Sequence, residues 1–187
     1  HEIQVIDCVG EKCSHADLSN KIVAFSPDVV GVTSFTVSLV DVLMVAETAK
    51  RLNPKVFTVL GGHHPIAFPF EAVSLAAFDC IVCGEGEHAF YDLINALENG
   101  DEFTGILGLY TKESIEAHRG IPFTDKRFLH NVAIPSAYIE DIDSLPIPSR
   151  KHIQHTSYNS TAGVSKNLAT IISSRGCPYR CTFCDVP

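Results

Sequence analysis

The first hundred residues alternate between short apolar runs and segments in which apolar positions recur at helical spacing. Apolar runs occupy residues 3–6, 29–32, 56–60 and 80–83. Between the second and third runs, one helix face is formed by Leu39, Val42, Leu43, Ala46, Ala49 and Leu52. Strands that are apolar throughout and alternate with helices predict a parallel sheet that is covered on both faces.

Polar motifs mark where the expected helices begin and end. Residues 14–17, Ser-His-Ala-Asp, resemble a capping box and predict a helix start, while Ser26-Pro27 stops that helix. A short helix is expected near residues 70–75, and a longer one ends at Asn99-Gly100. We therefore expect a Rossmann-like (flavodoxin-like) α/β domain over residues 1–105. A small hairpin is expected over 105–120, inside a connector that extends to residue 165.

Ligands of open parallel sheets bind beyond the carboxyl ends of the strands. Three loops lie there, at residues 33–38, 61–65 and 84–87, and all three contain glycine or small polar residues. One such loop alone is ordinary turn chemistry. Three loops of this kind, following neighbouring strands, favour a binding site.

Composition narrows the classes of partner. The chain has 187 residues, 45% of them hydrophobic and 19% charged, as in globular domains with a core. Its net charge of −8 argues against binding of nucleic acid. No window reaches the roughly 18 apolar residues of a membrane span. The first residues lack the pattern of a signal peptide, so we expect a cytoplasmic protein.

Three of the seven cysteines lie within eight residues, at Cys177, Cys181 and Cys184. The odd number of cysteines and the expected compartment argue against a disulfide framework. Thiolates suit zinc or iron–sulfur clusters. A structural zinc site needs a fourth ligand, and His152 and His155 lie far upstream. Three ligands instead suit a [4Fe–4S] cluster with one open iron, which can bind a chelating substrate.

The spacing Cys177-x3-Cys181-x2-Cys184, after Ser174-Arg175-Gly176 and with Phe183 before the last cysteine, resembles the signature of the radical S-adenosylmethionine superfamily. The resemblance implies that the open iron chelates the amino and carboxylate groups of S-adenosylmethionine. Reductive cleavage then yields a 5′-deoxyadenosyl radical, and Phe183 lies against the adenine. A zinc site or a purely structural cluster is the alternative.

The front of the chain resembles the cobalamin-binding domain that precedes the radical barrel in one branch of that superfamily. The resemblance lies in residues 27–34, 61–65 and 84–87 and in the connector segment 139–148. Glycines in such loops let the nucleotide tail of a corrinoid approach the backbone. For His64, a solvated residue or a helix-start contact is an equally good interpretation. The resemblance implies cobalamin contacts from Thr33, Ser34, Gly61, Gly62, His64, Gly84, Glu85 and Gly86.

Two features depart from what is usual for such domains. The D-x-H-x-x-G sequence that supplies an axial histidine in other cobalamin proteins does not occur, which implies cobalamin bound without a protein histidine. The family domain has five strands, and this chain begins at what resembles the second. We therefore expect an incomplete cobalamin-binding domain (1–105), a hairpin and connector (106–165), and the start of a (β/α) barrel with its cluster loop (166–187). Its first strand is expected at 169–173. Such a fragment should not turn over substrate.

The resemblance implies methyl transfer to an unactivated carbon or phosphorus, with methylcobalamin as the methyl donor to a substrate radical. An oxidative cyclase of the magnesium-protoporphyrin monomethyl ester type is the alternative in the same branch. We expect a small-molecule substrate and a reductant protein, a flavodoxin or ferredoxin. The sequence does not indicate which residues are catalytic.

The other cysteines allow a methylthiotransferase with a second cluster. Against this, Cys80 and Cys83 are three apart on a strand and should point to opposite faces. Small buried residues are therefore the favoured interpretation. A docking module that binds no corrinoid is the non-enzymatic alternative.

Overall fold

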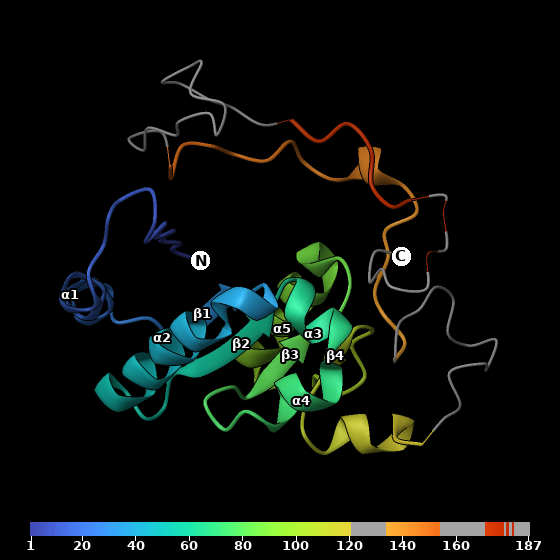
Figure 1. The fold of residues 1–187 in the computed structure, drawn as a ribbon, viewed down its shortest axis with the longest axis horizontal. Helices are drawn as coiled ribbons and strands as arrows, with labels where there is room; N and C mark the ends of the chain where they lie inside the picture. The colour runs from blue at the N-terminus through green and yellow to red at the C-terminus, as the bar shows by residue number, and fades with distance from the viewer. Residues whose placement is uncertain (121–133, 154–170, 178, 180, 182–187) are drawn as a thin grey trace. The chain divides into compact units, whose positions relative to one another are not determined.

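The computed structural model describes residues 1–120, 134–153, 171–177, 179 and 181 (Figure 1). These residues belong to two compact units. One comprises 1–26 and 141–175, and the other comprises 27–140 and 176–187. None of the described helices is long and apolar enough to cross a lipid bilayer.

The larger unit is built on a sheet of four strands in the order β1-β2-β3-β4. They are β1 (Val29–Thr33), β2 (Phe57–Gly61), β3 (Cys80–Val82) and β4 (Leu109–Tyr110). The first three strands are parallel, and β4 pairs antiparallel with β3. The expected parallel α/β sheet is confirmed.

The expected hairpin over 105–120 is wrong. Leu109 and Tyr110 are buried at the sheet edge beside β3 and do not pair with a following strand. The backbone N–H of Thr111 donates to the Ser114 hydroxyl (2.9 Å), and the Ser114 N–H donates to the Thr111 hydroxyl (3.2 Å). These local bonds begin the 3₁₀ helix η2 (Ser114–His118) where the second arm was expected.

Helices cover both faces of the sheet (Figure 1). Helices α2 (Leu39–Leu52) and α4 (Pro69–Ser74) pack on one face, through Ala46, Ala72 and Val73 against Leu60 and Ile81. Helix α5 (Gly86–Asn99) packs on the other, through Ala89 and Leu93 against Val59 and Val82. The short α3 (His63–Ala67) and η1 (Thr36–Ser38) were not expected.

The smaller unit contains α1 (His15–Phe25) and the 3₁₀ helix η3 (Ile142–Ser144). The predicted capping box is confirmed, since Ser14 Oγ accepts from the Asp17 N–H and the Asp17 carboxylate accepts from the Ser14 N–H. Residues 3–6 form no strand, and Ile3 and Val5 are exposed. Without a neighbouring strand, an apolar run cannot satisfy its backbone in a sheet.

Part of the expected strand 169–173 can be compared with the structure. Residues 169 and 170 lie outside the described residues. Ile171 and Ile172 are 87% and 81% exposed and, like Ser173, belong to no strand. In these residues the predicted strand is absent.

In the larger unit, residues 134–139 are tied to the carboxyl end of β3. The Ala137 N–H donates to the Cys83 carbonyl (3.1 Å), and the Glu85 N–H donates to the Ala137 carbonyl (2.8 Å). The Glu85 carboxylate accepts from the Ile139 N–H (2.6 Å). Gly84 and Ala137 form a parallel bridge. Residues 134–139, which we call the connector anchor, are therefore joined by hydrogen bonds and one isolated bridge to residues 83–85, just after β3.

This pairing requires glycine at position 84. Gly84 has φ +99°, and a Cβ there would overlap the backbone of Ala137. A side chain would have to displace the connector anchor, because backbone atoms cannot rotate away. Gly86, two residues on, would place a Cβ 3.7 Å from Val82 Cγ1, which is an ordinary contact.

We expect Gly84→Ala to detach the connector anchor and to lower the free energy of unfolding by about 1–3 kcal/mol, as for other strained backbone positions. Urea denaturation measures this loss. Chymotrypsin should also cleave after Tyr138 faster than in the parent protein. Gly86→Ala is the matched control and should leave both readouts unchanged. Equal cleavage rates in the two variants would contradict the proposed role of Gly84.

Candidate functional site

The ends of β1 and β2 lie level with each other, because Thr33 pairs with Gly61 in the parallel register. The two loops that follow are joined by backbone hydrogen bonds. The Ser34 N–H donates to the Gly61 carbonyl (2.9 Å), and the His64 N–H donates to the Ser34 carbonyl (3.0 Å). The structure therefore brings together Thr33, Ser34, Gly61, Gly62 and His64, as the predicted site requires.

The two glycines of this site differ. Gly62 has φ +92°, and a Cβ there would lie 2.5 Å from Thr33 Oγ1 and 2.7 Å from Ser34 N. Glycine is therefore required at position 62, because the chain's own loops approach each other closely there. At Gly61 a Cβ would meet only Val32 O, at 3.9 Å. Glycine at position 61 is therefore not required by close contacts within the chain.

Ser34 and His64 place polar atoms inside the site. Their exposed fractions are 2% and 1%, so His64 is not a solvated residue. His64 Nδ1 is hydrogen-bonded to Thr36 Oγ1 (3.2 Å). Among the described residues, Ser34 Oγ and His64 Nε2 are buried and have no hydrogen-bond partner. Such an atom costs about 1–3 kcal/mol. A polar ligand group that hydrogen-bonded to Ser34 Oγ or His64 Nε2 would recover this cost.

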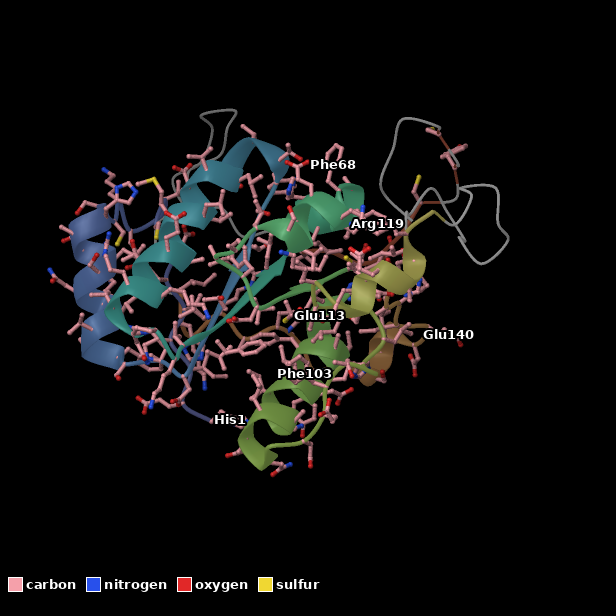
Figure 2. The ribbon with its side chains drawn as sticks, turned by 90° about the horizontal axis from the view of Figure 1, so that it is seen from below. His1, Phe68, Phe103, Glu113, Arg119 and Glu140 are labelled. Carbon is pink, nitrogen blue, oxygen red and sulfur yellow. The ribbon has the colours of Figure 1, made fainter. Side chains whose placement is uncertain are left out.

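Exposed aromatic rings stand beside these buried polar atoms. Phe35 is 59% exposed and stacks on His63 with ring centroids 4.9 Å apart. Phe68 is 48% exposed and lies where α3 ends, 5.6 Å from the His64 ring (Figure 2). Sequence reasoning missed Phe35, Thr36 and Phe68. An aromatic residue within or just after each predicted loop was the available signal.

The third predicted loop makes different contacts. Gly84 and Glu85 hydrogen-bond and bridge to the connector anchor, and Gly86 begins α5. The contacts that join the first two loops do not extend to these three residues. Their part in binding a ligand stays a prediction.

Two of the three predicted cluster ligands lie at the end of the described chain. Cys177 and Cys181 are exposed, whereas Phe183 and Cys184 lie outside the described residues. Within the described part, no group of three or more His, Cys, Asp or Glu side chains is arranged to hold a metal ion. The three-cysteine site therefore stays a prediction.

Cys80 and Cys83 lie in different cores, on opposite faces of the sheet, as predicted. Burial raises the pKa of the Cys80 thiol to about 12, and burial raises the pKa of Cys83 still further. The Cys83 thiol donates to the Pro65 carbonyl (3.2 Å). These two protonated thiols cannot share a metal, which weakens the interpretation as a two-cluster methylthiotransferase.

The site combines features that suit a corrinoid. Buried hydroxyl and imidazole groups match the amide and phosphate groups of its periphery and tail, while the exposed rings match an apolar macrocycle. Gly61 has no side chain in the way of a ligand at this edge of the sheet. The described residues therefore fit the group that the sequence predicted.

Comparisons with known proteins agree with this geometry. The model of the B12-binding domain matches residues 1–94. An uncharacterized methyltransferase of Pyrococcus horikoshii is 35% identical over 98% of this chain and 37% of its own length. The anaerobic magnesium-protoporphyrin IX monomethyl ester cyclase of Rubrivivax gelatinosus is 27% identical over 98% of this chain and 31% of its own. The chain thus spans about a third of these relatives.

A solved structure is also similar. It is TsrM of Kitasatospora setae, a radical S-adenosylmethionine methyltransferase with cobalamin and a [4Fe–4S] cluster bound. The two chains are 26% identical and superpose with a TM-score of 0.51. The matched region covers 58% of this chain and 21% of the TsrM chain. The cofactors expected from the sequence are those of this group. The chain therefore belongs to the B12-binding domain family, in the branch of radical S-adenosylmethionine proteins that its motifs predicted.

Proposed function

We propose that the whole protein is a cobalamin-dependent radical S-adenosylmethionine methyltransferase acting on an unactivated carbon or phosphorus. The observation that carries the proposal is the pair of buried, unpartnered atoms Ser34 Oγ and His64 Nε2 at the carboxyl edge of a B12-binding domain. Their position coincides with the ligand edge of parallel α/β sheets.

Each residue of the site has a definite part in this proposal. Ser34 and His64 would hydrogen-bond the polar periphery or tail of the corrinoid, while Thr36 fixes the His64 ring through Nδ1. Gly61 would leave room for the tail, and Phe35 would contact the apolar macrocycle. When bound, cobalamin supplies the transferable methyl group.

The cluster loop has the second part. Cys177, Cys181 and Cys184 would hold a [4Fe–4S] cluster as thiolates, leaving one iron for S-adenosylmethionine, and Phe183 would lie against its adenine. When bound, the cluster and S-adenosylmethionine supply a 5′-deoxyadenosyl radical. A small-molecule substrate, a flavodoxin or ferredoxin as reductant, and a cytoplasmic location complete the proposal.

Oxidative cyclisation is a second candidate. It is favoured by the similarity to the cyclase of Rubrivivax gelatinosus, which extends over 98% of this chain. The described residues bind cofactor in either reaction, so they do not distinguish the two.

Gly61→Val tests the cofactor site without disturbing the fold. Valine suits the end of a strand, and its Cβ meets nothing closer than 3.9 Å. We expect the free energy of unfolding to change by less than about 0.5 kcal/mol. The dissociation constant for cobalamin, measured by spectroscopic titration, should rise at least about tenfold, or about 1.4 kcal/mol. Gly105→Ala, with open space around its Cβ, is the control. Unchanged affinity in Gly61→Val would refute this cleft.

Ser34→Ala tests whether the Ser34 hydroxyl binds a ligand or stabilises the fold. Removing an unpartnered buried hydroxyl should leave the cobalamin-free protein equally stable or more stable, because a desolvation cost disappears. Cobalamin affinity should fall about five- to tenfold, equivalent to about 1–1.4 kcal/mol. Ser74→Ala removes a hydroxyl that donates to Glu71 and should not alter affinity. If Ser34→Ala destabilised the cobalamin-free protein, the hydroxyl would have a structural partner instead.

The reaction is tested on the whole enzyme with S-adenosylmethionine that carries a deuterated methyl group. We expect the label in the product, together with 5′-deoxyadenosine. An unlabelled, oxidised product would favour the cyclase, and absence of both cobalamin and iron would favour the docking module. Cys184→Ala should abolish 5′-deoxyadenosine formation. If that variant still formed it, the cluster assignment would be wrong.

A further inference from the structure

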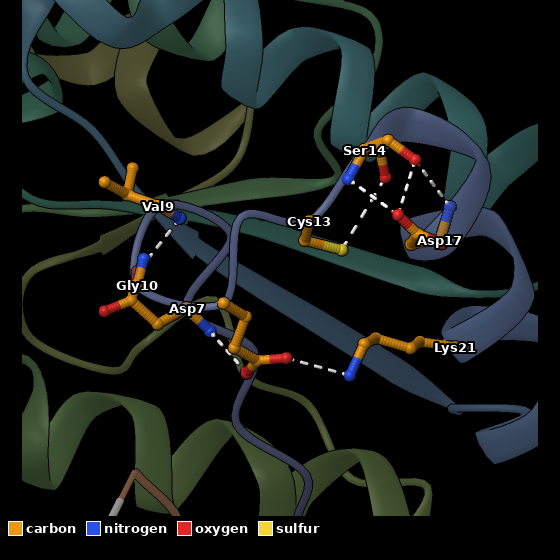
Figure 3. A network of polar contacts seen from close by, with 8 residues as sticks. Asp7, Val9, Gly10, Cys13, Ser14, Asp17 and Lys21 are labelled. Carbon is orange, nitrogen blue, oxygen red and sulfur yellow. Dashed lines mark hydrogen bonds and ion pairs between the residues drawn. The ribbon is translucent and has the colours of Figure 1, made fainter. Parts of the chain in front are cut away.

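The segment before α1 folds into a compact loop that contains Cys8 and Cys13. Figure 3 shows part of this loop, with the Cys13 side chain. The Cys13 N–H donates to the Cys8 carbonyl (2.8 Å), which closes a ring of six residues. An overlapping bond runs from the Glu11 N–H to the Asp7 carbonyl (2.8 Å). The backbone therefore holds Cys8 and Cys13 next to each other.

Charged side chains fix the shape of this loop. The Asp7 carboxylate accepts from the N–H groups of Val9 (3.1 Å) and Gly10 (2.9 Å). The Glu11 carboxylate accepts from the Asp7 N–H (3.2 Å) and forms an ion pair with Lys21 of α1 (2.8 Å). Figure 3 shows these contacts running from the loop to the helix. The loop is thus anchored independently of any bond between the two sulfur atoms.

The backbone bond from Cys13 to Cys8 brings the two thiols into each other's neighbourhood, and the Cys13 thiol donates to the Ser14 carbonyl (3.6 Å). Both residues are partly exposed free thiols. Cys80 and Cys83, by contrast, are buried in the sheet cores. Access to solvent and proximity of a second thiol are the two requirements for a reversible disulfide.

We propose that Cys8 and Cys13 form a redox-active dithiol, which small-molecule disulfides oxidise reversibly to an intrachain disulfide. The dithiol gives up two electrons and two protons, and the external disulfide becomes two thiols. Neither cysteine is among the predicted cobalamin or cluster residues, and the proposal does not depend on the proposed function.

The surroundings of the thiols assign their roles. The pKa of the Cys8 thiol is raised, first by burial, then by the neighbouring Cys13, and further by Glu11 and Asp7. Cys8 therefore keeps its proton, and we assign the first attack to Cys13, whose thiol lies in an exposed hydrogen bond to the Ser14 carbonyl (3.6 Å). The Cys13 thiolate forms a bond to one sulfur of the external disulfide and expels the other as a thiolate. Cys8 then loses its proton, attacks the Cys13 sulfur and releases the second thiol.

Peptide mapping tests this on the whole chain. The protein is equilibrated without oxygen in mixtures of reduced and oxidised glutathione, quenched in acid, alkylated and digested with trypsin. Trypsin cleaves after Lys12 and Lys21, so Cys8 and Cys13 fall in different peptides. We expect a linked pair of these two peptides under oxidising conditions and its loss after reduction. The peptides that carry Cys177, Cys181 and Cys184 begin after Arg175 and are counted separately.

Single substitutions of Cys8 and Cys13 test which thiol attacks the external disulfide first. Cys8→Ser should abolish the linked peptides and leave glutathione trapped on Cys13, because no second thiol can displace it. Cys13→Ser should accumulate less glutathione on Cys8. Absence of glutathione on Cys80 in every sample shows that the variants stay folded, because Cys80 is buried in the native protein. Separately alkylated Cys8 and Cys13 peptides in fully oxidised glutathione would overturn the proposal, and so would equal glutathione adducts in the two variants.

Discussion

The parallel pairing of β1 with β2 determines the geometry of the candidate site. Because the register sets Thr33 level with Gly61, the two following loops leave the sheet at the same height and contact each other at once. Their hydrogen bonds bury Ser34 and His64. A slip of one residue would turn these side chains to the other face. The unpartnered atoms, the close approach at Gly62 and the lack of close contacts at Gly61 all follow from this one register.

Most of the fold could be predicted from the sequence, because its signals are local. The periodicity of α2, the capping box of α1 and the glycine that ends α5 act within one or two helical turns. The errors have non-local causes. Residues 3–6 were predicted to form a strand but belong to a unit whose described residues form no sheet. Leu109 and Tyr110 pair with β3, which is distant in sequence, and the Thr111–Ser114 bonds begin η2 where the second arm of the hairpin was expected.

The site could be predicted only as a set of loops. Glycine and small polar residues after each apolar run indicated where the chain turns at the ligand edge. They did not indicate which glycine would leave room for a ligand and which is required by close contacts within the chain. Gly62 and Gly84 are both constrained by neighbouring backbone, from Ser34 and from Ala137. Ala137 lies more than fifty residues from Gly84, so no local pattern could reveal that contact.

The four cysteines outside the cluster motif show how environment divides one residue type into two chemistries. Cys80 and Cys83 share a strand, yet its alternation of side chains places them in separate apolar cores. There burial favours the protonated thiol and excludes reagents. Cys8 and Cys13 are further apart in sequence, but a backbone hydrogen bond closes the loop between them near solvent. Spacing alone would favour Cys80 and Cys83 as the pair of thiols that react together. The path of the backbone between two cysteines decides instead whether their thiols can meet.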